Sequence, residues 1–144
     1  MKSVADVMRP MVLTMDSYST VAEAAQKMKE FDVGALAVMS AGAVVALLTD
    51  RDIVVRAVAE RRDLNLTRIE EIMSGIPIAC KMDDSLEKAA ELLSDHKIHR
   101  LLVTDGSNRA VGILSLADLV IEIAAEDSRI LLHALQDLNT CGRP

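Results

Sequence analysis

Residues 97–120 read KIHRLLVTDGSNRAVGILSLADLV, and residues 32–54 read DVGALAVMSAGAVVALLTDRDIV. Each stretch holds two apolar runs joined by a short turn, and near its end a hydroxyl residue is followed three positions later by an aspartate. Short apolar runs with turn residues between them are typical of paired strands. The likeness of the two stretches indicates that the chain contains one structural unit in two copies.

The repeat extends through most of the chain. Equivalent segments at an offset of 65 residues include Val7-Met8 with Ile72-Met73, Thr20-Val21 with Ser85-Leu86, Ala24-Ala25 with Ala89-Ala90, and Leu36-Ala37-Val38 with Leu101-Leu102-Val103. The offset becomes 66 at Thr49 and Ser115, because the turn of the second copy is one residue longer. We therefore expect a first copy at residues 1–62, a second at 63–126, and a C-terminal amphipathic helix and tail at 127–144.

Each copy predicts the order β-α-β-β-α, so the expected fold class is mixed α/β (α+β) with tandem repeats. The expected strands are residues 11–14, 35–40 and 43–48 in the first copy and 76–80, 100–104 and 110–114 in the second. Capping residues predict the helix starts, at Thr20 with Glu23, at Asp84 or Ser85, and at Thr49 and Ser115.

The two copies are expected to need each other. A copy of about 60 residues buries too little surface to be comfortable alone. Residues 43–48 are apolar enough to suggest burial on both faces of their sheet. We therefore expect the copies to pack sheet against sheet as an intramolecular pair related by a pseudo-two-fold axis, which leaves two clefts.

Charge and aromatic content argue against nucleic acid as a partner. The net charge is −6, and the aromatic residues are Tyr18 and Phe31. Binding to a nucleic-acid backbone needs a basic surface, and single strands are held by stacking rings. Residues 33–49 carry no charge, but they are short for a membrane span and are interrupted by the turn at Ser40-Ala41-Gly42. We expect neither nucleic acid nor a membrane as a partner.

The remaining signals favour a reduced, cytoplasmic protein without catalysis. Asp6 and Arg9 fall where a signal peptide needs its apolar core. Cys80 and Cys141 share no metal or redox spacing, so we expect one buried thiol and one free thiol on a mobile tail. No metal-ligand spacing surrounds the three histidines, and no nucleophile motif occurs, so neither a metal site nor an enzyme is expected.

A C-terminal amphipathic helix is predicted over residues 126–138. Its apolar stripe comprises Ile130, Leu131, Ala134, Leu135 and Leu138. The stripe has two interpretations of similar weight. In one, the helix covers its own fold; in the other, it seals a dimer or docks on an effector protein.

These motifs resemble those of the CBS domain family, the cystathionine-β-synthase type of module, over roughly residues 1–125. In the second copy, KIHRLLVTD and AVGILSLADLV are similar to the nucleotide-binding repeats of the AMP-activated kinase γ subunit, and ALLTDRDIV carries the same end motif in the first copy. The resemblance implies a Bateman module, a regulatory unit with no obligatory cofactor. It also implies an adenosine-containing ligand (AMP, ADP, ATP, S-adenosylmethionine or NAD), a homodimer and signalling to an effector protein.

The aspartate motifs allow two explanations. Thr49 with Asp52, and Ser115 with Asp118, are explained without a ligand as helix caps. They also fit a helix start that offers N–H groups to phosphate, with a carboxylate to accept ribose hydroxyls. The resemblance assigns Asp52 and Asp118 to ribose and the two hydroxyl residues to phosphate.

The resemblance also predicts which residues share a site. The expected first site combines Thr14 with His99, Arg100, Gly112, Ser115 and Asp118. The expected second site combines Ile78, Ala79 and Cys80 with Thr49, Arg51 and Asp52. Gly112 would permit close approach of the ligand to the strand, where the first copy has Ala46, and Arg51 would replace the His-Arg cation that Gly34-Ala35 lacks.

We therefore expect the ligand at the first site. Ala46 and the missing basic pair of the first copy leave open the alternative of a ligand-free structural or dimerisation module.

Overall fold

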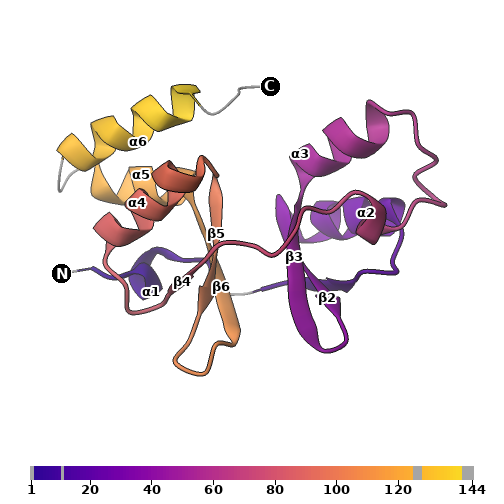
Figure 1. The fold of residues 1–144 in the computed structure, drawn as a ribbon, viewed down its shortest axis with the longest axis horizontal. Coiled ribbons are helices and arrows are strands. Elements are labelled where there is room, and N and C mark those ends of the chain that lie inside the picture. Colours follow the sequence, from indigo (N-terminus) through magenta and orange to yellow (C-terminus); the bar gives the residue numbers. More distant parts are fainter. Residues whose placement is uncertain (1, 11, 125–127, 141–144) are drawn as a thin grey trace. The chain divides into compact units, whose positions relative to one another are not determined.

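The computed structural model describes residues 2–10, 12–124 and 128–140. They form two compact units, one of residues 13–77 and one that joins residues 1–12 to residues 78–144. Each unit holds a three-stranded sheet with helices against one face (Figure 1). The mixed α/β repeat fold expected from the sequence is confirmed.

The unit of residues 13–77 is the first unit. Its elements are β1 (Thr14–Asp16), α2 (Val21–Phe31), β2 (Ala35–Ser40), β3 (Ala43–Thr49), α3 (Asp50–Ile53), the π-helical η1 (Val54–Val58) and the 3-10 turn η2 (Ile69–Glu71). The sheet order is β1-β2-β3, with β1 parallel and β3 antiparallel to β2. The hydroxyl of Thr20 caps α2 by accepting the Glu23 amide at 3.2 Å, as the sequence predicts.

The second unit repeats this order. It contains β4 (Ala79–Lys81), α4 (Leu86–His96), β5 (Arg100–Thr104), β6 (Ala110–Ser115), α5 (Leu116–Ile123) and α6 (Ser128–Thr140). The short helix α1 (Val4–Val7) belongs to the same unit, although it precedes the first unit in the sequence. Its sheet order is β4-β5-β6 with the same directions. Ser85 caps α4, and Ser115 caps α5.

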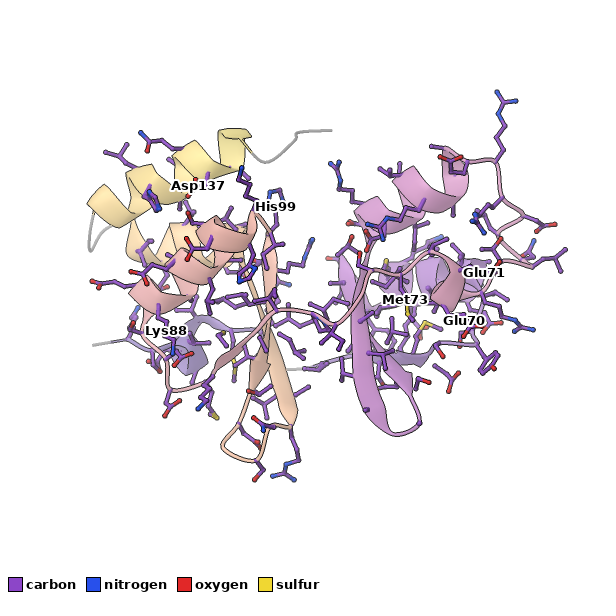
Figure 2. The ribbon with its side chains drawn as sticks, in the orientation of Figure 1. Glu70, Glu71, Met73, Lys88, His99 and Asp137 are labelled. Atoms are coloured by element: carbon purple, nitrogen blue, oxygen red, sulfur yellow. The ribbon has the colours of Figure 1, made fainter. Side chains whose placement is uncertain are left out.

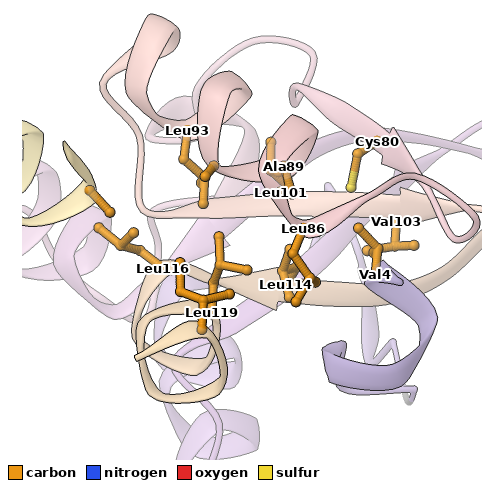
Figure 3. Close-up of a cluster of buried hydrophobic side chains, with 13 residues drawn as sticks. Val4, Cys80, Leu86, Ala89, Leu93, Leu101, Val103, Leu114, Leu116 and Leu119 are labelled. Atoms are coloured by element: carbon orange, nitrogen blue, oxygen red, sulfur yellow. The ribbon is translucent and has the colours of Figure 1, made fainter. Parts of the chain in front are cut away.

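A separate aliphatic core lies between the sheet and the helices of each unit. In the second unit, Leu101, Leu114 and Leu119 are fully buried, and Figure 3 shows Leu114 and Leu119 with Val4 of α1 in the same cluster. Leu36 and Leu48 are fully buried in the first unit, and Met73 packs against the same core (Figure 2). Burying one such leucine contributes about 1.5–3 kcal/mol, so these cores hold the helix starts in place.

The first segment of the chain packs with the second copy of the repeat, which the sequence did not indicate. We call residues 2–10 the N-terminal strap. The amides of Val4 and Ala5 donate to the carbonyls of Asp84 and Met82, each at 2.9 Å. Residues 63–77 belong instead to the first unit, where the Val21 amide donates to the Thr67 carbonyl at 2.9 Å. The compact units therefore differ from the sequence ranges 1–62 and 63–126.

The inner strands β2, β3, β5 and β6 agree with the expected ranges to within one residue. The outer strands do not. Residues 11–14 and 76–80 were expected to be strands, but the ladders begin at Thr14 and Ala79. Pro77 lacks the N–H that a ladder needs, which helps to delay β4.

Burial along β3 also differs from the expectation. Ala46 and Leu48 are buried, whereas Val45 and Leu47 are half-buried, so burial alternates along the strand. Sheet-against-sheet packing of the two copies stays a prediction.

The C-terminal helix forms as α6 and packs on α4 and α5 (Figure 1). Ala134 is buried, and Leu138 packs against the second core, so this part of the stripe covers the helix's own fold. Leu135 stays exposed. Glu126 and Cys141 lie outside the described residues, as do the side chains of Ile130 and Leu131. In the described part of the chain, no helix is both long and apolar enough to cross a membrane.

Candidate functional site

The candidate residues of the second copy meet where β6 runs into α5. The Ser115 hydroxyl accepts the Asp118 amide at 3.1 Å, and the His99 carbonyl accepts the Leu116 amide at 2.7 Å. Arg100 lies directly across the β5–β6 ladder from Ser115. One end of one sheet therefore holds His99, Arg100, Ser115 and Asp118, and their use as one ligand site stays a prediction.

The carboxylate of Asp118 is paired with a cation that sequence reasoning missed. Arg9 of the N-terminal strap donates from its Nε to Oδ2 of Asp118 at 3.2 Å. The backbone of Arg9 is held on β6, because its amide donates to the Ile113 carbonyl at 2.9 Å and its carbonyl accepts the Ile113 amide at 3.1 Å. The strap therefore places a cation at the start of α5, and this cation lies 109 residues from Asp118 in the sequence.

Gly112 has a role within the chain itself. A Cβ atom at this position would lie 2.6 Å from Sδ of Met8 and 2.7 Å from the carbonyl oxygen of Arg9. The strap crosses β6 at a distance that only glycine allows. This contact explains the glycine without the ligand approach that the sequence suggested.

The helix start of the first copy is closed by its own side chains. Thr49 and Asp52 form a reciprocal capping box, in which the Asp52 amide donates to the Thr49 hydroxyl at 3.2 Å and Oδ2 of Asp52 accepts the Thr49 amide at 2.9 Å. The amide of Arg51, between these two residues, donates to the Asp50 carboxylate at 2.8 Å. This geometry matches the explanation of the motif as a helix cap.

Arg56, rather than Arg51, is the cation beside Asp52. Its Nη2 lies 3.9 Å from Oδ1 of Asp52, and its Nη1 donates to the Ile72 carbonyl at 3.0 Å and to the Ser74 hydroxyl at 2.8 Å. The spacing of four residues between Asp52 and Arg56 was the available signal for this pair. The side chain of Arg51 is exposed.

The residues expected to come from the first strands belong to the opposite units. Thr14 lies in β1 of the first unit, where its carbonyl accepts Nζ of Lys27 at 2.6 Å. Ile78 precedes β4 of the second unit, and Ala79 and Cys80 lie in it. Pairing of these residues with the helix starts of the other copy stays a prediction.

The thiol of Cys80 points into the core of its own unit (Figure 3). Desolvation by burial, with a smaller contribution from the Asp84 carboxylate, raises the pKa of this thiol to about 11. The buried thiol expected from the sequence is confirmed for Cys80. Because the thiol lies in the core, Cys80 can contact a ligand only through its backbone atoms.

A cluster of three polar side chains joins α6 to α4. The Ser94 hydroxyl contacts Nε2 of His133 at 3.0 Å and bonds to Oδ2 of Asp137, while Nε2 of His133 and Oδ2 of Asp137 are 3.3 Å apart. Figure 2 labels Asp137 on α6. Serine and aspartate approach the same ring nitrogen, so the geometry differs from that of a hydrolase triad, in which they occupy opposite nitrogens. Among the residues that the structure describes, no cluster of three His, Cys, Asp or Glu side chains could hold a metal ion.

Comparison with known proteins identifies the family. The model of the CBS domain matches residues 4–58 and 69–125, and the chain belongs to this family of paired repeats. The CBS domain-containing protein YhcV of Bacillus subtilis is 39% identical over 128 residues, which cover 89% of this chain and 90% of that protein.

Two solved structures of similar fold contain adenosine compounds. The CBS domain protein PAE2072 from Pyrobaculum aerophilum, complexed with AMP, is 25% identical with a TM-score of 0.75, covering 94% of this chain and 99% of that one. The CBS domain pair of protein MJ0100, in complex with 5′-methylthioadenosine and S-adenosyl-L-methionine, is 26% identical with a TM-score of 0.76, covering 88% and 98%.

Proposed function

We propose that this chain is a regulatory module whose second copy binds an adenosine-containing ligand and passes the signal to an effector protein. The single observation that supports this most strongly is that Asp118 lies in the first turn of α5 while Arg100 pairs across the ladder with Ser115, the cap of that helix. A carboxylate suits the two hydroxyls of a ribose, and an arginine grips a phosphate with two bonds. AMP in one structural neighbour and S-adenosylmethionine in another support the same class of ligand.

The amides at the helix starts support a ranking of the two copies. In the first copy, the second amide of the helix, that of Arg51, donates to the side chain of Asp50. The equivalent amide of the second copy belongs to Ala117, and the residue before it is Leu116, whose side chain has no acceptor. An amide at the positive end of a helix suits an anionic oxygen. We therefore assign the ligand to the second copy, with His99 and Arg100 as the phosphate side.

Thermal melts with AMP, ADP, ATP, NAD and S-adenosylmethionine test this function. A ligand at 100 times its dissociation constant adds about 2.7 kcal/mol to the free energy of unfolding. We expect at least one of these ligands to raise the melting temperature, and we expect Asp118→Ala and Arg100→Ala to remove the shift. Asp52→Ala is the matched control, because it removes the equivalent carboxylate of the first copy. A shift with none of the five ligands, or equal losses from Asp52→Ala and Asp118→Ala, would refute the proposal.

A second candidate, a dimerisation module, rests on exposed aliphatic side chains at equivalent positions. Val55 of η1 and Ile121 of α5 correspond at the 66-residue offset, and they are 44% and 75% exposed. Two separated helices that expose an aliphatic residue at the same position suit a contact with a second copy of the chain. We propose a homodimer through these helices. Light scattering should give twice the monomer mass, and Val55→Asp with Ile121→Asp should return the monomer; a wild-type monomer at high concentration would exclude it.

A further inference from the structure

Arg9 is positioned as a part of the second-copy site, although it lies outside every repeat motif. Two backbone hydrogen bonds to Ile113 fix its main chain, and the glycine at position 112 lets the strap lie directly on the strand. Its side chain is 66% exposed, and its Nε pairs with Oδ2 of Asp118. The main chain of Arg9 is therefore fixed, while its guanidinium is in contact with solvent.

This ion pair occupies the oxygen on which the proposed ligand depends. A carboxylate that receives two ribose hydroxyls uses both of its oxygen atoms, so one hydroxyl must share Oδ2 of Asp118 with the Nε–H of Arg9. An exposed pair of this kind is weak, and it exchanges easily with solvent or with another anion. The guanidinium keeps five N–H donors after it leaves Asp118, and a phosphate is the anion that they fit best.

We propose that Arg9 is the selectivity residue of this site: it covers Asp118 in the empty protein and transfers to the ligand's phosphate when the ribose takes the carboxylate. This inference rests on the proposed function, and it specifies the ligand class as adenosine carrying a 5′-phosphate. A neutral nucleoside weakens the ion pair and offers Arg9 no other anion. A nucleotide supplies a second anion in exchange, so the site favours AMP over adenosine.

The first copy shows why the exchange is assigned to the second copy alone. Ser74 stands at the position equivalent to Arg9, and the cation near Asp52 is Arg56. Arg56 is held by the Ile72 carbonyl and the Ser74 hydroxyl, and Oδ2 of Asp52 is bound by the Thr49 amide. Neither partner of that pair can leave without breaking hydrogen bonds within the fold.

Calorimetric titration of the whole chain with AMP and with adenosine tests the proposal, because the two ligands differ only in the phosphate. We expect Arg9→Gln to weaken AMP binding about tenfold, which is about 1.4 kcal/mol. Adenosine should bind the same variant equally well or a few-fold more tightly, since its ribose no longer competes with a guanidinium. Arg9→Lys keeps the charge without the planar fork and should fall between the wild type and Arg9→Gln for AMP.

Arg109→Gln is the matched control. It breaks an ion pair of the same geometry in the same unit, from Nε of Arg109 to Oδ2 of Asp105 at 3.2 Å, in the β5–β6 turn. This variant should leave both affinities unchanged. Circular dichroism of the ligand-free variants should give the wild-type spectrum, because the strap is held through its backbone.

Three outcomes are distinguishable. A fall in the ratio of AMP affinity to adenosine affinity in Arg9→Gln supports the role of Arg9. An unchanged ratio, with wild-type protein that binds AMP, overturns the role of Arg9 and leaves the proposed function intact. Wild-type protein that binds none of AMP, ADP, ATP, NAD, S-adenosylmethionine and adenosine overturns both.

Discussion

The two helix starts of this chain derive from one motif but are held differently. At Thr49 the aspartate three residues on bonds back to the Thr49 amide and lies near Arg56 of the following η1. At Ser115 the aspartate three residues on pairs with Arg9, which comes from the N-terminal strap. The same four-residue pattern therefore makes a closed cap in one copy and an ion pair with an exposed arginine in the other. Local sequence fixes the cap, and a distant segment decides what else the carboxylate binds.

The largest expected effect concerns the residue at which the strap crosses the strand. Gly112→Ala should lower the free energy of unfolding by about 2 kcal/mol, because the new methyl group overlaps Met8 and the Arg9 carbonyl. The reverse change in the first copy, Ala46→Gly, should cost about 1 kcal/mol through the lost methyl group and the freer backbone. Urea denaturation measures both. A Gly112→Ala protein as stable as the wild type would show that the strap does not lie on β6.

The two arginines should separate a structural ion pair from an exchangeable one. Arg56→Gln should cost about 1.5 kcal/mol, since it removes a charged donor from the Ile72 carbonyl and the Ser74 hydroxyl. Arg9→Gln should cost no more than about 0.5 kcal/mol, as is usual for an exposed pair. The same urea experiment compares them. Equal costs would mean that both arginines serve mainly to stabilise the fold.

Removing the capping hydroxyls should have equal effects on stability but unequal effects on binding. Thr49→Ala and Ser115→Ala should each cost about 1 kcal/mol, the usual value for a lost helix cap. Only Ser115→Ala should also weaken AMP binding, because only that helix start is assigned to the ligand. Denaturation and calorimetry on the same two proteins check this pair. A matching loss of AMP affinity in Thr49→Ala would place a ligand in the first copy as well.

The smallest expected effect is a pH dependence carried by one copy. The first copy has Met15 where the second has Cys80, whose pKa is raised from its ordinary value of 9.0 to about 11. Between these values the unfolded chain has lost the thiol proton and the native protein still holds it, so stability falls as pH rises through this interval.

The slope contributed by this thiol is at most that of one proton, and Cys80→Met should remove it from a series of denaturation curves recorded above neutral pH. The difference in pH slope between wild type and variant should disappear well below pH 9.0, where the thiol is protonated in both states. An identical alkaline slope in the two proteins would show that the thiol is open to solvent.

Much of the fold could be read from the sequence because its signals are local. The turns at Gly42 and at Asn108 separate apolar runs, and capping hydroxyls mark the helices, so β2, β3, β5, β6 and the four capped helix starts lie within one residue of their expected positions. The first strands were displaced because only their parallel ladders define them. A parallel ladder joins residues that are far apart in the sequence.

The partner of Asp118 could not be read in this way. Nothing in the segment that contains Arg9 states which copy it packs on, and the segment equivalent to it, around Ser74, packs on the other unit. Alignment of the two copies does show that Arg9 and Gly112 stand where the first copy has Ser74 and Ala46. These two differences lie about a hundred residues apart in the sequence. Their connection becomes visible only when the strap is placed on β6, where the two residues meet.

The strap also orders the assembly of the chain in time. Residues 13–77 form a continuous unit that can close as soon as they leave the ribosome, whereas the second unit combines residues 1–12 with residues synthesised after position 77. The segment that carries Arg9 is made before residues 13–77 and finds its place on β6 only after Ile113 has been added. A nascent chain stopped before that point would expose Val4 and Met8, which the core of the second unit covers in the complete fold.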